Sequence, residues 1–139
     1  MNKKDEVIVA VAAVITDDQR RVLLSLRSEE PKKGYWHHPG GAPKFGESLH
    51  QALKRELREE LGIEAETTSV QPVFVSQTII PREDRHIICL FYEARVVSGA
   101  PRPAQGTAKV GFFNETEAGK LRLLDSCRDF LNKRHGWRL

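Results

Sequence analysis

The chain has 139 residues, of which 40% are hydrophobic and 29% are charged, and its formal net charge is +3. This length suits one domain with a hydrophobic core, and the composition excludes a largely disordered protein. No run approaches the roughly 18 apolar residues of a membrane-spanning helix. The mild positive charge suits an anionic small molecule and a nucleic acid equally well. We therefore expect one domain over residues 1–139, with no membrane segment.

The chain begins with charged residues, and a β-branched, almost uncharged segment follows over residues 7–16. A secretory signal peptide would begin in a similar way, but this segment lacks a clear cleavage site and runs into Asp17-Asp18. We expect a buried strand here and a cytoplasmic protein. Cys89 and Cys127 lie far apart in apolar contexts, and we expect two reduced, packed thiols rather than a disulfide or a metal pair.

The rest of the chain mixes strands with helices. Runs of β-branched and apolar residues between turn residues predict strands, and apolar residues three and four apart predict helices. Irregular segments rich in Pro and Gly predict loops that are long enough to carry function. The mixture indicates an α/β fold. In chain order we expect a strand over 21–26, a loop over 28–43, a helix over 49–61, strands over 70–80 and 86–97, a loop over 98–107, a strand over 110–113 and a helix over 115–134.

The helix over 49–61 has the clearest signals. Ser48 and Gln51 fit a capping box, and Gly62 follows where a left-handed C-cap is favoured. Leucines at positions 49, 53, 57 and 61 form the stripe that faces the core. At 100° per residue, three glutamates share a sector of about 100° that borders this stripe. These are Glu56, Glu59 and Glu60, and we expect Lys54, Arg55 and Arg58 on the far side.

Three carboxylates beside a buried face need a compensating charge. Two of them about 6 Å apart repel by roughly 3 kcal/mol at an effective dielectric of about 20. Protonation, an arginine or a divalent cation can relieve this repulsion, and oxygen ligands favour Mg²⁺ or Mn²⁺. A solvated helix face with an Arg55–Glu59 pair is the alternative. The preceding Gly40-Gly41 pair favours the metal site, because a tight backbone there can leave a carbonyl or amide free for an ion or a phosphate.

Together these residues resemble the Nudix box of the MutT-like Nudix hydrolases. The box reads Gly, five residues, Glu, seven residues, and then Arg-Glu-apolar-any-Glu-Glu-any-Gly-apolar. Seven fixed residue types would coincide at a given start with a chance on the order of 10⁻⁹. Residues 36–40, Trp-His-His-Pro-Gly, also resemble the family's aromatic entry to the box. The matching residues are Gly41, Glu47, Arg55, Glu56, Leu57, Glu59, Glu60, Gly62 and Ile63.

The resemblance implies an α/β/α sandwich with a mixed sheet. It also implies an enzyme that uses Mg²⁺, or alternatively Mn²⁺, to hydrolyse a nucleoside diphosphate linked to another moiety. In that case Glu56, Glu59 and Glu60 would be catalytic metal ligands, together with the Gly40 carbonyl, and Arg55 would orient a glutamate through a bidentate contact.

Supporting roles follow from the same resemblance. Glu47 would brace the loop onto the helix. Gly40, Gly41 and Arg27 would bind substrate phosphate, and a solvated strand end is the alternative for Arg27. The expected partner is a small-molecule nucleotide, bound by a monomer or a homodimer, with nucleic acid disfavoured because aromatic and basic residues do not interleave.

The resemblance does not identify the general base that activates the water, or the substrate. Many members carry a further glutamate before the last strand, but residues 101–109 contain no acid. The base would then be a box glutamate, or Glu83, Asp84 or Glu93. A normal or modified (deoxy)nucleoside triphosphate leads as substrate, followed by nucleoside diphosphate sugars and dinucleoside polyphosphates. A nucleotide sensor without catalysis is another class. Histidines that could touch a base or a phosphate, unless they are simply packed or solvated, are His37, His38 and His86.

Overall fold

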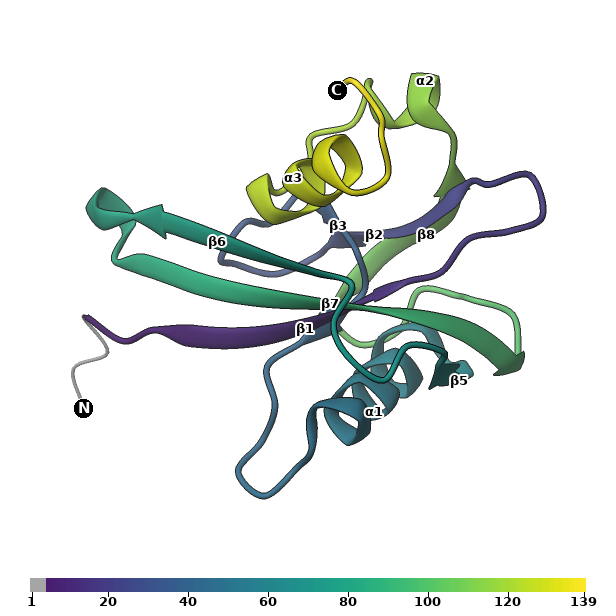
Figure 1. Cartoon of the computed structure of the whole chain (residues 1–139), viewed down its shortest axis with the longest axis horizontal. Coiled ribbons are helices and arrows are strands. Elements are labelled where there is room, and N and C mark those ends of the chain that lie inside the picture. The colour runs from purple at the N-terminus through teal and green to yellow at the C-terminus, as the bar shows by residue number, and fades with distance from the viewer. Residues whose placement is uncertain (1–4) are drawn as a thin grey trace.

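The computed structural model describes residues 5–139 and arranges them as helices on both faces of a mixed sheet (Figure 1). Residues 1–4, which begin the charged amino terminus, lie outside the described residues. The predicted α/β/α sandwich is therefore confirmed. No helix within residues 5–139 has the length and apolar character needed to cross a membrane.

The larger sheet is built on a parallel pair. β1 (Ile8–Val14) lies beside β7 (Arg85–Ser98), in register from Ile8 opposite Ile87 to Val14 opposite Glu93. Because β7 has 14 residues, its two halves pair with different antiparallel neighbours. These neighbours are β6 (Phe74–Ile80) and β5 (Glu64–Thr67). On its other side, β1 pairs with β4 (Gly40–Gly41). A second, antiparallel sheet has the strand order β3 (Trp36–His37), β2 (Val22–Arg27), β8 (Thr107–Phe113).

Each face of the larger sheet has its own core (Figure 1). α1 (Leu49–Leu61) buries Leu53, Leu57 and Leu61 in one cluster, and the exposed fraction of each is at most 1%. α3 (Asp125–Lys133) buries Phe130 and its neighbours in the other cluster. Burial of each such side chain contributes about 1.5–3 kcal/mol to folding. The two cores hold the sheet and both helices in fixed relative positions.

Cys89 and Cys127 are buried, free thiols, as predicted. Burial raises the pKa of the Cys89 thiol to about 12. The pKa of the Cys127 thiol is also raised, mainly by burial. Since the thiolate is the reactive form, both cysteines act as packing groups of the α3-side core.

The predicted helix over 115–134 is wrong. The segment forms α2 (Glu115–Ala118) and α3, with an extended stretch between them. There the Trp36 N–H donates to the Arg122 carbonyl at 2.7 Å, and the Leu124 N–H donates to the Trp36 carbonyl at 2.9 Å. The backbone pairs with β3 instead of continuing as a helix, because this pairing satisfies its polar groups and buries Leu123.

Other differences lie at strand ends. The predicted strand over 70–80 begins at Phe74, two residues after Pro72, which has no N–H for a ladder bond. The strand predicted over 110–113 begins earlier, at Thr107, and the loop over 28–43 contains β3 and β4. β5 was not predicted, since Glu-Ala-Glu-Thr has little of the β-branched and aromatic character typical of strands. A short 3-10 turn, η1 (Pro81–Glu83), joins β6 to β7.

Candidate active site

α1 begins and ends at the predicted residues because both ends are capped locally. The Ser48 side chain accepts from the Gln51 N–H at 3.1 Å, and the Gln51 side chain accepts from the Ser48 N–H at 2.9 Å. Gly62 takes a left-handed conformation, with φ of 65°, and its N–H donates to the Arg58 carbonyl. The helix therefore presents its glutamates at defined positions beside the sheet.

The glycine pair lets the backbone pass close to two neighbours. A Cβ added to Gly40 would lie 1.9 Å from the Val11 carbonyl oxygen of β1. A Cβ added to Gly41 would lie 2.6 Å from the Glu56 carboxylate carbon. The first contact is with backbone and leaves no space for a side chain, whereas the second would force the Glu56 carboxylate to move. Gly40 and Gly41 are thus required so that β4 can pair with β1 while the Glu56 carboxylate lies against it.

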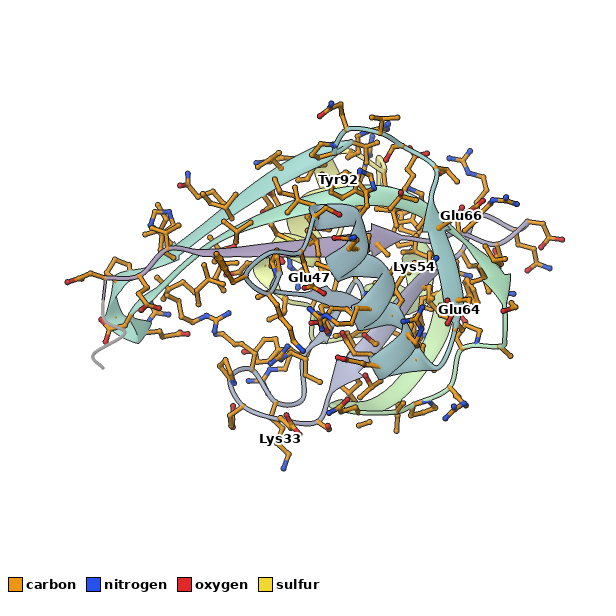
Figure 2. All side chains as sticks on the ribbon, turned by 90° about the horizontal axis from the view of Figure 1, so that it is seen from below. Lys33, Glu47, Lys54, Glu64, Glu66 and Tyr92 are labelled. Carbon is orange, nitrogen blue, oxygen red and sulfur yellow. The ribbon has the colours of Figure 1, made fainter. Side chains whose placement is uncertain are left out.

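Arg55 connects the helix to the preceding loop. Its Nε and Nη2 donate to the two Glu47 oxygens at 2.6 Å and 2.9 Å, in a bidentate ion pair. Its Nη1 donates to Glu56 Oε1 at 3.0 Å and to Glu59 Oε2 at 3.2 Å. The expectation that Arg55 lies on the far side of the helix is wrong. The loop carrying Glu47 folds back over the helix and covers Arg55, whose side chain is only 17% exposed; Figure 2 shows Glu47 close to α1.

These contacts fix the charge of the outer part of the site. The Arg55 guanidinium, followed by the Lys44 N–H, lowers the pKa of Glu47 to about 2. Reciprocally, the hydrogen bond to Glu47 is the largest of the effects that raise the pKa of Arg55. Both groups are therefore ionised at any ordinary pH, and the loop is held to the helix by a charge-assisted pair.

The inner part of the site has the opposite character. Burial, followed by a hydrogen bond with Glu56 and charge repulsion from it, raises the pKa of Glu60 to about 9. The Gly40 N–H and the Arg27 charge offset only part of this effect. Glu60 Oε2 is buried and has no hydrogen-bond partner among the described residues. Two adjacent carboxylates, one with an unpaired oxygen, form a donor set that a hard cation such as Mg²⁺ would satisfy.

The three box glutamates do not yet converge on one point. Within residues 5–139, no three Asp, Glu, His or Cys side chains are grouped closely enough to hold a metal ion as they stand. Glu56 and Glu59 share one Arg55 nitrogen, whereas Glu60 turns toward Gly40. Side-chain rotations of the exposed Glu59 would be part of any closure around an ion, since 39% of its side chain is accessible.

A cavity of about 350 Å³ adjoins this group through Gly40, Gly41 and Arg27. Its size falls in the range of small-molecule sites. More cations than acids line it. The Arg85 Nε lines the cavity, is buried without a hydrogen-bond partner among the described residues, and lies 4.0 Å from Glu83 Oε1. The lining charges are Arg27, Lys32, Arg82, Arg85, Glu83 and Asp125.

Arg27 lies at the end of β2 and lines this cavity, so it is not a solvated strand end. Its Nε donates to the Pro31 carbonyl at 2.8 Å. Burial lowers its pKa, while the Glu60 charge opposes that shift. Lys32 and Arg85 were not predicted as site residues, because they reach the cavity only through the folding of the loop after β2 and of the β6–β7 turn. Lys33, at the tip of the loop after β2, points away from the rest of the molecule (Figure 2).

The other candidate acids and histidines differ in whether they line the cavity. Glu83 lines the cavity and forms an ion pair with Lys32 at 3.0 Å. Asp84 is the left-handed residue of the turn, and Glu93 lies on β7 near Arg134; neither lines the cavity. His37 and His38 line the cavity. His38 is packed edge-on against Phe91 and Phe130, whereas His86 contacts Gln77 instead.

The acid-free loop over 101–109 closes the end of α1. The N–H groups of Arg102, Ala104 and Gln105 donate to the carbonyls of Leu61, Glu60 and Glu59, at 3.0, 2.9 and 3.2 Å. These are carbonyls that a helix end leaves without internal partners. The loop therefore holds the backbone of the last helical turn, where two of the box glutamates lie.

Comparison with known proteins identifies the family. The NUDIX domain model matches residues 7–131. An ADP-ribose pyrophosphatase of Methanocaldococcus jannaschii is 31% identical to this chain. The match covers 81% of this chain but only 65% of that relative's own length. An 8-oxo-dGTP diphosphatase of Proteus vulgaris is 31% identical over 72% of this chain and 87% of its own. The crystal structure of a MutT NUDIX hydrolase from Burkholderia pseudomallei superposes with a TM-score of 0.81 at 27% identity, covering 94% of this chain and 99% of that one. The chain belongs to the NUDIX domain family.

Proposed function

We propose that the protein hydrolyses a phosphoanhydride bond in a nucleoside diphosphate linked to another moiety. The observation that carries this proposal is the buried Glu56–Glu60 pair, with its unpartnered oxygen, next to a cavity lined by cations. The pair suits a divalent cation, and the cations suit a substrate with several phosphates. Both halves of a diphosphate-cleaving site thus lie side by side.

We assign the metal to Glu56, Glu59, Glu60 and the Gly40 carbonyl, with Mg²⁺ first and Mn²⁺ as the alternative. When bound, such an ion neutralises phosphate charge and lowers the pKa of a water. Arg55 orients Glu56 and Glu59 through its shared Nη1, and Glu47 holds Arg55 in place. Arg27 and Arg85 are placed to bind phosphate oxygens from the cavity side.

A box glutamate is the better proton acceptor. Glu83 also lines the cavity, but the hydrogen bond from Lys32 lowers its pKa and makes it a weaker base. Glu59 is one of the three box glutamates and has an accessible side chain. We therefore propose that one of the box glutamates, and not an acid from the loop over 101–109, accepts the proton of the attacking water.

A (deoxy)nucleoside triphosphate, normal or modified, is the leading substrate class. The 8-oxo-dGTP diphosphatase relative supports it, and the chain covers most of that protein. The ADP-ribose pyrophosphatase relative supports a nucleoside diphosphate linked to a sugar as the second class. A panel of nucleoside triphosphates including 8-oxo-dGTP, ADP-ribose and dinucleoside polyphosphates, assayed with Mg²⁺ by chromatography of the products, ranks these classes. Binding of a nucleotide without any product would instead identify a sensor.

Metal dependence gives a separate test. Excess EDTA should abolish turnover, and added Mg²⁺ or Mn²⁺ should restore it. Zn²⁺ should not be the preferred ion, since it favours nitrogen and sulfur ligands. Full turnover in excess chelator would contradict the metal assignment. Isothermal titration of Mg²⁺ into the nucleotide-free protein reports the same site without an activity readout.

A further inference from the structure

The carboxylate of Glu83 lies among cations at one side of the cavity. Its Oε1 is 3.0 Å from Lys32 Nζ and 4.0 Å from Arg85 Nε. Its Oε2 is 3.9 Å from Nη2 of Arg82, a more exposed residue at the rim. All four residues line the cavity, and the side chains of Lys32 and Arg85 are only 21% and 18% exposed. One carboxylate oxygen thus lies beside both an ammonium and a guanidinium group.

The loop after β2 holds Lys32 in the cavity by contacts of its own. Lys32 Nζ lies over the ring of Tyr35, 5.3 Å from its centre. The loop is tied to the end of β2, because Arg27 Nε donates to the Pro31 carbonyl at 2.8 Å. Neither contact involves Glu83. The ammonium group can therefore stay beside the cavity when the Glu83 carboxylate moves away.

The positive charge of this group continues toward the box glutamates. Burial lowers the pKa of Arg27, the Glu60 charge opposes that shift, and the Arg85 charge adds to it. Arg27 therefore lies near both residues, and cations extend from the box side through Arg85 to Lys32. The metal ligands and Arg27 are sufficient for a diphosphate. Further cations beyond them suit a substrate with more phosphate groups.

We propose that Lys32 and Arg85, with Arg82 at the rim, bind a third phosphate of the substrate, and that the Glu83 carboxylate occupies this subsite until the substrate displaces it. A phosphate oxygen accepts from the same N–H donors as a carboxylate oxygen. The carboxylate can turn to solvent, because Glu83 belongs to the short turn η1 and 32% of its side chain is already exposed.

This inference rests on the proposed function and narrows its substrate class. Nucleoside triphosphates and dinucleoside polyphosphates with three or more phosphates can fill the subsite. ADP-ribose cannot, because its two phosphates are both taken by the bond that is cleaved. The cations around Glu83 thus act in specificity, and the box glutamates act in the reaction itself.

Removal of the Glu83 charge tests the displacement. Isothermal titration of inorganic triphosphate into the metal-free protein reports the subsite without turnover. Glu83→Gln should lower the dissociation constant at least about 5-fold, because a competing charge leaves the cations. Asp84→Asn is the matched control, since it removes the same charge from the next residue, which does not line the cavity. Asparagine also tolerates the left-handed φ of 52° at this position. The control should change the constant less than about 2-fold.

Removal of the Lys32 charge tests the cations. Lys32→Met should raise the dissociation constant for triphosphate at least about 5-fold. Lys33→Met is its control, because the neighbouring Lys33 points away from the rest of the molecule (Figure 2). ATP and ADP-ribose, titrated in the same way, locate the third phosphate. Lys32→Met should weaken ATP more than ADP-ribose, since both contain adenosine and two phosphates and only ATP has the third.

Four results would overturn the inference. One is a Glu83→Gln variant that binds triphosphate no more tightly than the parent, which would make Glu83 a structural support between the two segments. Another is an equal effect of Lys32→Met and Lys33→Met, which would reflect net charge alone. A third is an equal effect of Lys32→Met on ATP and on ADP-ribose. The last is no triphosphate binding by parent or Glu83→Gln up to about 10 mM.

These results are separate from the tests of metal dependence and of hydrolysis. A protein that cleaves ADP-ribose with Mg²⁺ but shows none of the expected changes would keep the proposed function and lose the third-phosphate subsite. Changes in triphosphate binding without any hydrolysis would do the reverse. Circular dichroism melts check that each variant is folded.

Discussion

Glu47 and Glu60 are the same residue type on two sides of one site, and their surroundings give them opposite properties. Glu47 meets a guanidinium and stays ionised, with its pKa lowered to about 2. Glu60 is buried beside Glu56, and its pKa is raised to about 9. The outer side is complete in the protein alone, whereas on the inner side the Arg27 charge offsets only part of the effect of burial on Glu60. Their surroundings thus suit Glu47 to structural support and Glu60 to the proposed chemistry.

The largest effect should come from the inner side. Glu59→Gln or Glu60→Gln should lower turnover about 100-fold or more at saturating Mg²⁺, since each removes a proposed metal ligand. The melting temperature of the metal-free protein should stay equal or rise, because Glu59→Gln removes one charge from a crowded group, and Glu60, with its pKa raised to about 9, is already protonated at pH 7. Turnover rates and thermal melts of the same samples measure both effects.

Glu66→Gln is the control for this experiment. Glu66 lies on β5 and pairs with Arg95, away from the cavity. Its replacement should leave turnover close to the parent's. If the box variants also turned over like the parent, the glutamates would be a solvated helix face and the catalytic assignment would be wrong.

A second experiment extends the comparison to a buried group without any partner. His38 is 3% exposed, and neither ring nitrogen has a hydrogen-bond partner among the described residues. Burial lowers its pKa to about 3, so at pH 5 the unfolded chain binds a proton that the folded protein does not. The contribution of neutral, buried His38 to the free energy of unfolding is fully present above the ordinary histidine pKa of about 6.5 and falls as the pH drops. By pH 5 the loss is about 2 kcal/mol.

His38→Phe should remove this part of the acid sensitivity, since a phenyl ring keeps the edge-on packing and does not titrate. The measurement is the free energy of unfolding by urea at pH 8 and at pH 5, for parent and variant. Comparing each protein with itself cancels the packing change. An equal loss of stability in both proteins would show that His38 does not titrate in this range.

The smallest effect should come from the outer side. Glu47→Gln should lower the melting temperature at pH 7, because the bidentate pair with Arg55 is lost. Since the pKa of Glu47 is lowered to about 2, its contribution is present above its ordinary pKa and is lost as the pH falls toward 2. The melting curves of parent and variant should therefore converge between about pH 5 and about pH 2. Curves that stay parallel would contradict the assigned role of Glu47.

Local signals made part of this structure predictable. The limits of α1 follow from Ser48, Gln51 and Gly62, which act within one turn of the helix. Contacts between distant segments were not predictable. Arg55 was misplaced because a helical projection does not show the loop that folds over it. The break between α2 and α3 depends on Trp36, about 85 residues earlier in the chain, and propensity cannot report such a partner.

The parallel pairing of β1 with β7 has a consequence for synthesis on the ribosome. Residues 8–14 emerge early, but their neighbour in the sheet spans residues 85–98. Until then β1 has, within the larger sheet, only the two-residue β4 beside it. The nascent chain must therefore hold an uncharged, β-branched strand in solution while residues 15–84 are made. A chaperone that shields this segment would act during that interval, and a chain released before residue 85 would have no sheet in which to place it.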